Sequence, residues 1–157
     1  MQSRREVLDR ELDEIGATAL VVVAKSSRDP DLAPFVGSAH LGSSVLVCPR
    51  GGPPRLSFLT PMERDEAGST GLALTTPEEL EVEKLFREQL DAVAIHSAVL
   101  ARSLALAGVS PGRVALAGRA EAGVVHAACS RLETRGWLFL AGDEVVRHAT
   151  QQKSEIE

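Results

Sequence analysis

Histidine is the side chain in this sequence best suited to acid–base chemistry or metal binding, and its four copies lie far apart. They are His40, His96, His126 and His148. None has the HExxH or HxxxH spacing that directs two ligands from one helix to one metal ion. His40 differs from the others because it lies in a loop among small residues, GSAHLG, and loops held by a rigid sheet commonly carry functional groups. A structural and a functional role both remain open for His40.

His126 and Cys129 are the one pair with a helical spacing that points two ligands toward a single zinc ion. A structural zinc needs two further ligands, and none lies nearby in the sequence. His126 also falls opposite the apolar stripe of its predicted helix. We therefore interpret His126 as solvated. Because neither Cys48 nor Cys129 belongs to a CxxC pair, we interpret both as buried thiols rather than as a disulfide.

Other catalytic motifs are missing. The stretch GSAHLGSS lacks the GxSxG of a nucleophile elbow, and LAGRAEAG around Gly118 lacks the GxGxxG of a dinucleotide site. Gly118 is therefore more simply a tight turn between a strand and a helix. Acidic residues gather at helix starts, where they complement the helix dipole, and none interrupts a strand. A metal-dependent nuclease needs carboxylates on its strands, so it is the weakest interpretation; it predicts tight Mg²⁺ or Mn²⁺ binding.

The elements that must position these residues begin with a helix between Ser3 and Gly16, which has a capping-box start and a glycine stop. The continuous apolar run 19–24 predicts a strand covered on both faces. A loop follows over 25–42. Two apolar runs around a Gly-Gly-Pro-Pro corner, Ser43 to Cys48 and Arg55 to Leu59, then predict a hairpin.

The second half of the sequence alternates strands and helices. A short charged helix leads to a strand at Leu72–Leu74. A capping box at Thr76 then predicts the start of one helix, whose apolar stripe from Val82 continues for about seven turns until Gly108 ends it. The remaining predicted elements are a strand at Arg113–Ala117, a helix at Ala120–Arg135, a strand at Trp137–Ala141 and a last helix from Asp143. This order predicts an α/β fold with a mixed β-sheet, helices on its faces, and an antiparallel hairpin followed by βαβ units.

Size and charge limit the class of protein. A chain of 157 residues with a net charge of −5 suits one globular domain, and its acidity argues against nucleic acid as a partner. The apolar run from Ala17 to Ala24 is too short to span a bilayer, and it follows an acidic helix rather than the basic start of a signal peptide. We therefore expect a cytoplasmic protein without a membrane partner.

The layout resembles the N-terminal domain of the Xaa-Pro peptidase, prolidase and creatinase family. REVLDRELDEIGATALVVVAKSS is similar to its leading helix and first strand, and DLAPFVGSAHLGSSVLVCPRGGPPRLSFLTPMERDEA to the segment around its hairpin. GDEVVRHATQQKSEIE resembles the helix that connects to the catalytic domain. Pro34 and Val36 stand where the family usually has tyrosine and threonine.

This resemblance implies a ribonuclease H-like domain over residues 1–142 and, over 143–157, a linker helix toward an absent C-terminal catalytic domain. In that family the catalytic domain has the pita-bread fold and binds a divalent metal pair (Mn, Co or Zn). All of its ligands would follow Glu157, so the resemblance implies no catalytic residue, metal ligand or cofactor in this chain. The last helix carries no stop signal up to Ile156, which fits either a cut chain or a frayed end.

The function implied is that of a non-catalytic domain of a Xaa-Pro dipeptidase- or aminopeptidase-like metallopeptidase. It would help to form a homodimer and narrow the entrance for Xaa-Pro peptides, with Phe35 and His40 of the 31–40 loop as candidate substrate-gate residues. The alternative is a free-standing binding or regulatory domain of the same fold. The sequence does not separate dipeptidase, aminopeptidase and creatinase-like activities.

Overall fold

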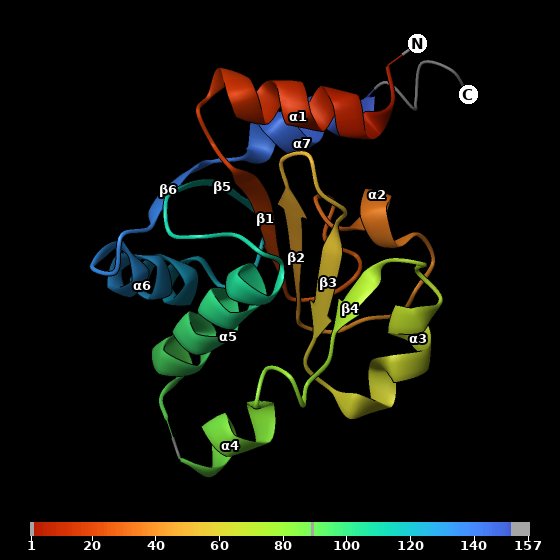
Figure 1. Cartoon of the computed structure of the whole chain (residues 1–157). Coiled ribbons are helices and arrows are strands. Elements are labelled where there is room, and N and C mark those ends of the chain that lie inside the picture. The colour runs from red at the N-terminus through yellow and green to blue at the C-terminus, as the bar shows by residue number, and fades with distance from the viewer. Residues whose placement is uncertain (1, 89, 152–157) are drawn as a thin grey trace.

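The computed structural model describes residues 2–88 and 90–151, so the last part of the predicted linker helix, residues 152–157 with Ile156, lies outside the described residues. Helices and strands are interspersed along the described chain (Figure 1). In chain order they are α1 (Arg4–Glu14), β1 (Ala19–Ala24), α2 (Ala33–Val36), β2 (Ser44–Pro49), β3 (Arg55–Phe58), η1 (Pro61–Glu63), α3 (Arg64–Gly68), β4 (Ala73–Thr75), α4 (Val82–Arg87), α5 (Ala92–Leu106), β5 (Arg113–Ala117), α6 (Ala122–Glu133), β6 (Leu138–Ala141) and α7 (Asp143–Gln151).

The strands of the described residues form one six-stranded sheet in the order β4-β3-β2-β1-β5-β6. β2 pairs antiparallel with β1 and β3, whereas β3–β4, β1–β5 and β5–β6 are parallel pairs. β2 is thus the single strand of this sheet that runs against the others. The mixed sheet, the early hairpin and the later βαβ units confirm the predicted α/β, ribonuclease H-like fold class.

β1 is covered on both faces, as its continuous apolar sequence predicts. All six of its residues are buried, and alternate side chains enter two different clusters because successive side chains of a strand point to opposite faces. Leu20 and Val22 belong to the cluster beneath α1 and α7, while Val21 and Val23 belong to the cluster beneath α5 and α6. The strand therefore lies between the two cores.

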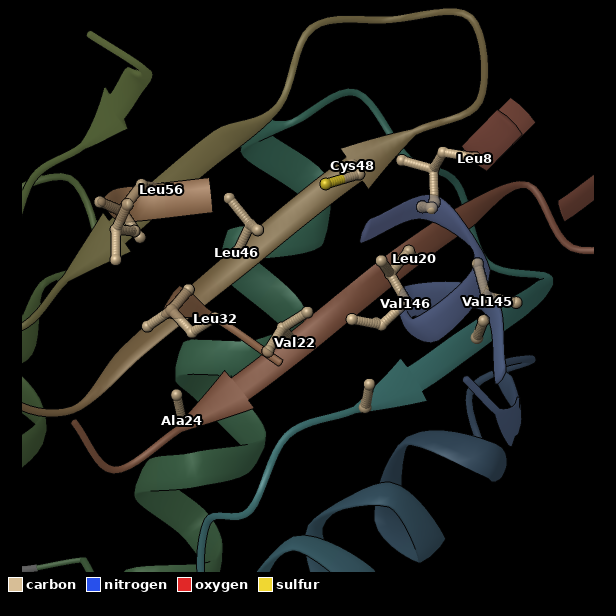
Figure 2. Close-up of a cluster of buried hydrophobic side chains, with 14 of the residues drawn as sticks. Leu8, Leu20, Val22, Ala24, Leu32, Leu46, Cys48, Leu56, Val145 and Val146 are labelled. Atoms are coloured by element: carbon tan, nitrogen blue, oxygen red, sulfur yellow. The ribbon is translucent and has the colours of Figure 1, made fainter. Parts of the chain in front are cut away.

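Helices cover both faces of the sheet. α1, α2, α3 and α7 contribute buried side chains to one cluster, and α4, α5 and α6 contribute to the other. Figure 2 shows the first cluster, in which Val145 and Val146 of α7 gather with Leu8 of α1 and Leu20 of β1. α7 packs along α1, as Figure 1 also shows. The apolar face of α7 is therefore buried, while the predicted division at residue 142 stays a prediction.

The start of α1 has the predicted capping box. The backbone N–H of Glu6 donates to Ser3 Oγ at 3.2 Å, and the N–H of Ser3 donates to Glu6 Oε2 at 3.1 Å. Gly16 follows the helix with φ of 71°, a left-handed conformation that glycine adopts without strain. Val7, Leu8 and Leu12 form the buried stripe.

The single helix predicted from Thr76 to Gly108 is wrong, because the chain forms two helices there, α4 and α5. The predicted capping box exists: Thr76 Oγ1 accepts from the N–H of Glu79 at 3.2 Å. The turn that it starts stops at Glu81, which is left-handed with φ of 56° and interrupts the helical path. Asp91 then starts α5, with its carboxylate accepting from the N–H of Ala94 at 2.8 Å.

No helix within residues 2–88 and 90–151 combines the length and the apolar character that passage through a bilayer requires.

Candidate functional site

The carboxyl ends of β1, β5 and β6 meet at one edge of the sheet, together with the amino end of β2. The long loop after β1 and the turn between β5 and α6 therefore start from the same edge. Neighbouring parallel strands whose connections leave in opposite directions create a crevice in which α/β proteins commonly bind ligands. A ligand site is therefore expected at this edge.

Two acidic residues hold the long loop against the β5–α6 turn. Asp29 Oδ2 accepts a hydrogen bond from the N–H of Arg119 at 2.5 Å, and Asp31 Oδ2 accepts from the N–H of Gly118 at 2.9 Å. Asp29 Oδ1 also accepts from the N–H of Asp31 at 2.9 Å, and Asp29 is only 7% exposed. These carboxylates satisfy backbone donors, so their role here is to position the loop.

Gly118 makes the close approach possible. Its φ is +104°, and a Cβ atom at this position would lie 2.1 Å from the carbonyl oxygen of Val23. No residue with a side chain fits without a shift of the β1 backbone. The prediction of a tight strand-to-helix turn at Gly118 is confirmed.

The far end of the loop is fixed by the short helices after β3. The N–H of His40 donates to Glu66 Oε2 at 2.9 Å, and the N–H of Gly42 donates to Glu63 Oε2 at 2.6 Å. Ser27 Oγ accepts from the N–H of Leu41 at 3.0 Å and ties the loop to its own beginning. His40 is exposed on a backbone that these bonds hold in place.

Phe35 lies on the other side of the loop, against α1. The guanidinium of Arg4 sits 5.4 Å from the centre of the Phe35 ring, and the same group donates to the carbonyl oxygen of Pro34 at 2.6 Å. Phe35 packs against the cluster beneath α1 and α7. The two candidate gate residues thus come from different parts of the loop, Phe35 half-buried on helix α2 and His40 exposed beside α3.

A cavity of about 130 Å³ opens between α5 and α6 at the same sheet edge; we call it the α5–α6 cavity. Its wall is apolar and includes Val23, Val45, Ile95, Val99, Leu100 and Val125. Its polar lining residues are Lys25, Glu121, His96, Ser43 and Ser44. Neither Phe35 nor His40 lines it. Sequence reasoning missed this site, because the residues come from β1, β2, α5 and α6 and share no motif.

A second hollow of about 430 Å³ lies on the other side of α6 and shares Val23 and Val125 with the first. His126 and Cys129 both line it, yet His126 is exposed and Cys129 is buried, as predicted. Within residues 2–88 and 90–151, no three His, Cys, Asp or Glu side chains gather closely enough to hold a metal ion.

Both thiols are poor nucleophiles. Burial raises the pKa of Cys48 to about 12 and that of Cys129 to about 11, because the interior disfavours the charged thiolate. Both cysteines are free and buried, which confirms their interpretation as buried thiols.

Comparison with known proteins gives a likeness of fold. No family model matches the sequence, and no curated protein sequence matches it. Among solved structures, the chain is similar to the prolidase from Pyrococcus horikoshii OT3, with a TM-score of 0.55 and 11% sequence identity. The match covers 92% of this chain and 33% of the prolidase chain, so the chain spans about a third of the length of that protein. The likeness shows a shared fold and fits one domain of a larger enzyme.

Proposed function

We propose that this chain is the non-catalytic N-terminal domain of a metallopeptidase that resembles Xaa-Pro dipeptidases and aminopeptidases. The observation that carries the proposal is the fold match, which takes in nearly all of this chain but only a third of the prolidase chain. A domain with that coverage leaves most of the prolidase length to another part of the enzyme. The order of helix, strand, hairpin and βαβ units supports the same assignment.

Catalysis in this proposal belongs to a C-terminal domain with a divalent metal pair of Mn, Co or Zn. Such metals polarise the scissile carbonyl and generate hydroxide near neutral pH. The present chain would help to form a homodimer and narrow the entrance to the active site for Xaa-Pro peptides. The buried thiols and the loop-positioning carboxylates of Asp29 and Asp31 suit a structural role.

The 31–40 loop is the part of the chain that we propose as the substrate gate. At one end of the loop, the Asp31 carboxylate accepts a hydrogen bond from the N–H of Gly118. At the other end, the N–H of His40 donates to the carboxylate of Glu66. These bonds would hold His40 at a constant position next to a neighbouring domain. Phe35 is held by Arg4 from α1. A loop that is ordered before substrate arrives loses little conformational entropy on binding.

The first experiment reads the coding frame after Glu157 and assays the complete product beside the 157-residue chain. We expect an Asp-Asp-His-Glu-Glu ligand set downstream and hydrolysis of an Xaa-Pro dipeptide by the complete product with Mn²⁺, Co²⁺ or Zn²⁺. The shorter chain should show none. Hydrolysis by the short chain after removal of contaminating enzymes, or a downstream frame without these ligands, would contradict the proposal.

The gate is tested by Phe35→Ala and His40→Ala in the complete enzyme. Their matched controls are Phe86→Ala on the exposed side of α4 and His126→Ala on the exposed side of α6. We expect the first pair to lower kcat/KM several-fold, mainly through KM, and the controls to leave it unchanged. Equal values for all four variants would remove the gate assignment and leave the domain assignment intact.

A free-standing binding domain is the second candidate function, and the α5–α6 cavity favours it. A cavity that lies entirely within this chain does not need a catalytic domain to bind a ligand. A stop codon directly after residue 157 together with ligand binding by the isolated chain would support this function over the first.

A further inference from the structure

The size of the α5–α6 cavity limits what enters it. Apolar cavities of about 150 Å³ hold a molecule the size of benzene, so about 130 Å³ accepts an apolar group of roughly four to six carbon atoms. The wall is formed by branched side chains of two strands and two helices, including Val23, Val45, Ile95 and Val99. Such a wall favours a compact branched hydrocarbon group.

Two side chains of opposite charge, Lys25 and Glu121, line the cavity. Lys25 Nζ lies 3.6 Å from Glu121 Oε1, and both side chains are largely exposed, at 72% and 64%. An exposed pair at this distance contributes little stability, so separating it to admit a ligand costs little. Glu121 holds the N-cap position of α6, yet its carboxylate makes no capping bond and stays available to a ligand.

The remaining polar groups add directional contacts. The ring Nδ1 of His96 lies 2.8 Å from the carbonyl oxygen of Ala92, and a carbonyl only accepts, so Nδ1 carries the hydrogen. Nε2 is then an acceptor in the neutral ring. Ser43 is exposed and offers a hydroxyl, whereas the Ser44 hydroxyl already donates to the carbonyl oxygen of Gly42 at 3.0 Å.

We propose that the α5–α6 cavity binds a small apolar α-amino acid of the size of leucine. The side chain fills the apolar cavity, the α-carboxylate pairs with Lys25, and the α-ammonium pairs with Glu121. One weak internal ion pair is thereby replaced by two pairs to the ligand. A simple fatty acid would leave Glu121 facing a carboxylate, and a simple amine would leave Lys25 facing an ammonium group. The site is independent of the proposed peptidase role.

Ligand truncation is the first test, performed on the 157-residue chain by calorimetry. We expect L-leucine to bind with a Kd of roughly 1 mM, since small ligands gain at most about 1.5 kcal/mol per non-hydrogen atom and usually much less. Isocaproate, isoamylamine and glycine remove the ammonium, the carboxylate and the side chain in turn. Each should bind about tenfold more weakly or worse, which corresponds to about 1.4 kcal/mol.

Variants then test which group of the ligand each charged side chain binds. Lys25→Met should weaken L-leucine and isocaproate but leave isoamylamine unchanged, and Glu121→Gln should weaken L-leucine and isoamylamine but leave isocaproate unchanged. Lys84→Met and Glu88→Gln are the matched controls, because these residues form a similar exposed pair at 4.0 Å at α4. Val125→Phe should abolish binding by filling the cavity, with thermal unfolding used to confirm that the variant is folded.

Three results would overturn the proposal. The first is no heat and no rise in Tm with L-leucine in large excess over the expected Kd. The second is equal affinity for L-leucine and isocaproate, which would make the site one for acids. The third is unchanged binding in a folded Val125→Phe variant, which would place the ligand elsewhere. None of these results bears on peptidase activity of a longer product.

Discussion

The backbone N–H of Arg119 donates to the buried carboxylate of Asp29 at 2.5 Å, across 90 positions of sequence. The same carboxylate accepts from the N–H of Asp31, so one side chain joins its own loop to the turn after β5. A backbone amide of the same turn, that of Gly118, binds the Asp31 carboxylate. This relationship fixes where the long loop lies.

Replacement of Asp29 should therefore destabilise the fold. We expect Asp29→Ala to lower the free energy of unfolding by about 2–3 kcal/mol, because two N–H groups lose a charged acceptor. Asp29→Asn keeps one acceptor oxygen and should lose about half as much. Urea unfolding measures both, and Glu14→Gln at the exposed end of α1 is the control. A loss under about 0.5 kcal/mol for Asp29→Ala would show that water replaces the carboxylate.

Gly118 and Gly123 should respond in opposite directions to alanine. At Gly118 the new Cβ meets the Val23 carbonyl oxygen at 2.1 Å and φ is positive, so we expect a loss above about 3 kcal/mol or failure to fold. At Gly123, inside α6, nothing lies within 4 Å of a Cβ, so alanine should stabilise by about 0.5–1 kcal/mol. Thermal unfolding of the two variants compares them directly. A tolerated Gly118→Ala would contradict the geometry of the turn.

The buried thiols predict a loss of stability in alkali. The pKa of Cys48 is raised from 9.0, the value of an ordinary thiol, to about 12 in the folded chain. Between these values the unfolded chain has released a proton that the folded chain retains. The stability linked to Cys48 is therefore fully present below about pH 9 and falls as the pH rises toward 12, by up to about 1.4 kcal/mol per pH unit.

Urea unfolding is measured at several pH values, from neutral upward, in the wild type, Cys48→Ala, Cys129→Ala and the double variant. Each substitution should make the decline above about pH 9 shallower, whatever its own effect at neutral pH, and the double variant should be shallowest. Identical slopes in all four proteins would mean that other groups cause the alkaline loss.

Removal of α7 should weaken the core beneath α1. Val145, Val146 and Ala149 are all at most 2% exposed and belong to the cluster that contains Leu8 and Leu20. A chain ended at Gly142 would expose this apolar surface, so we expect a loss of several kcal/mol and binding of a hydrophobic dye. Far-ultraviolet circular dichroism and dye fluorescence check this result. A truncated chain as stable as the original would support a domain boundary at residue 142.

Much of the fold was predictable because local signals and the tertiary structure agree. The valine-rich run of β1 and the Ser3–Glu6 capping box each indicate one conformation, and the structure has both. The break between α4 and α5 was missed because the apolar stripe continues through it, although the capping signal of Asp91 was present in the sequence. A left-handed glutamate such as Glu81 leaves no comparable signal.

The candidate site was less predictable. Loop position and the family resemblance point to His40 and Phe35 as gate residues, and the structure places them on different sides of the loop. The Asp-Pro-Asp stretch around Pro30 was a readable turn signal, because aspartate side chains commonly bond to nearby backbone N–H groups. The α5–α6 cavity depends on packing between elements far apart in sequence, such as those that carry Lys25 and Glu121, which no local pattern joins.

The position of β1 between the two clusters affects how cooperatively the protein unfolds. Leu20 and Val22 pack into one cluster, and Val21 and Val23 pack into the other. Because β1 contributes to both clusters, we expect that a loss of packing in one cluster also disrupts the other. Melting should therefore be all-or-none, with the calorimetric enthalpy equal to the van't Hoff enthalpy. We expect no populated intermediate in which only one face of the sheet keeps its packing.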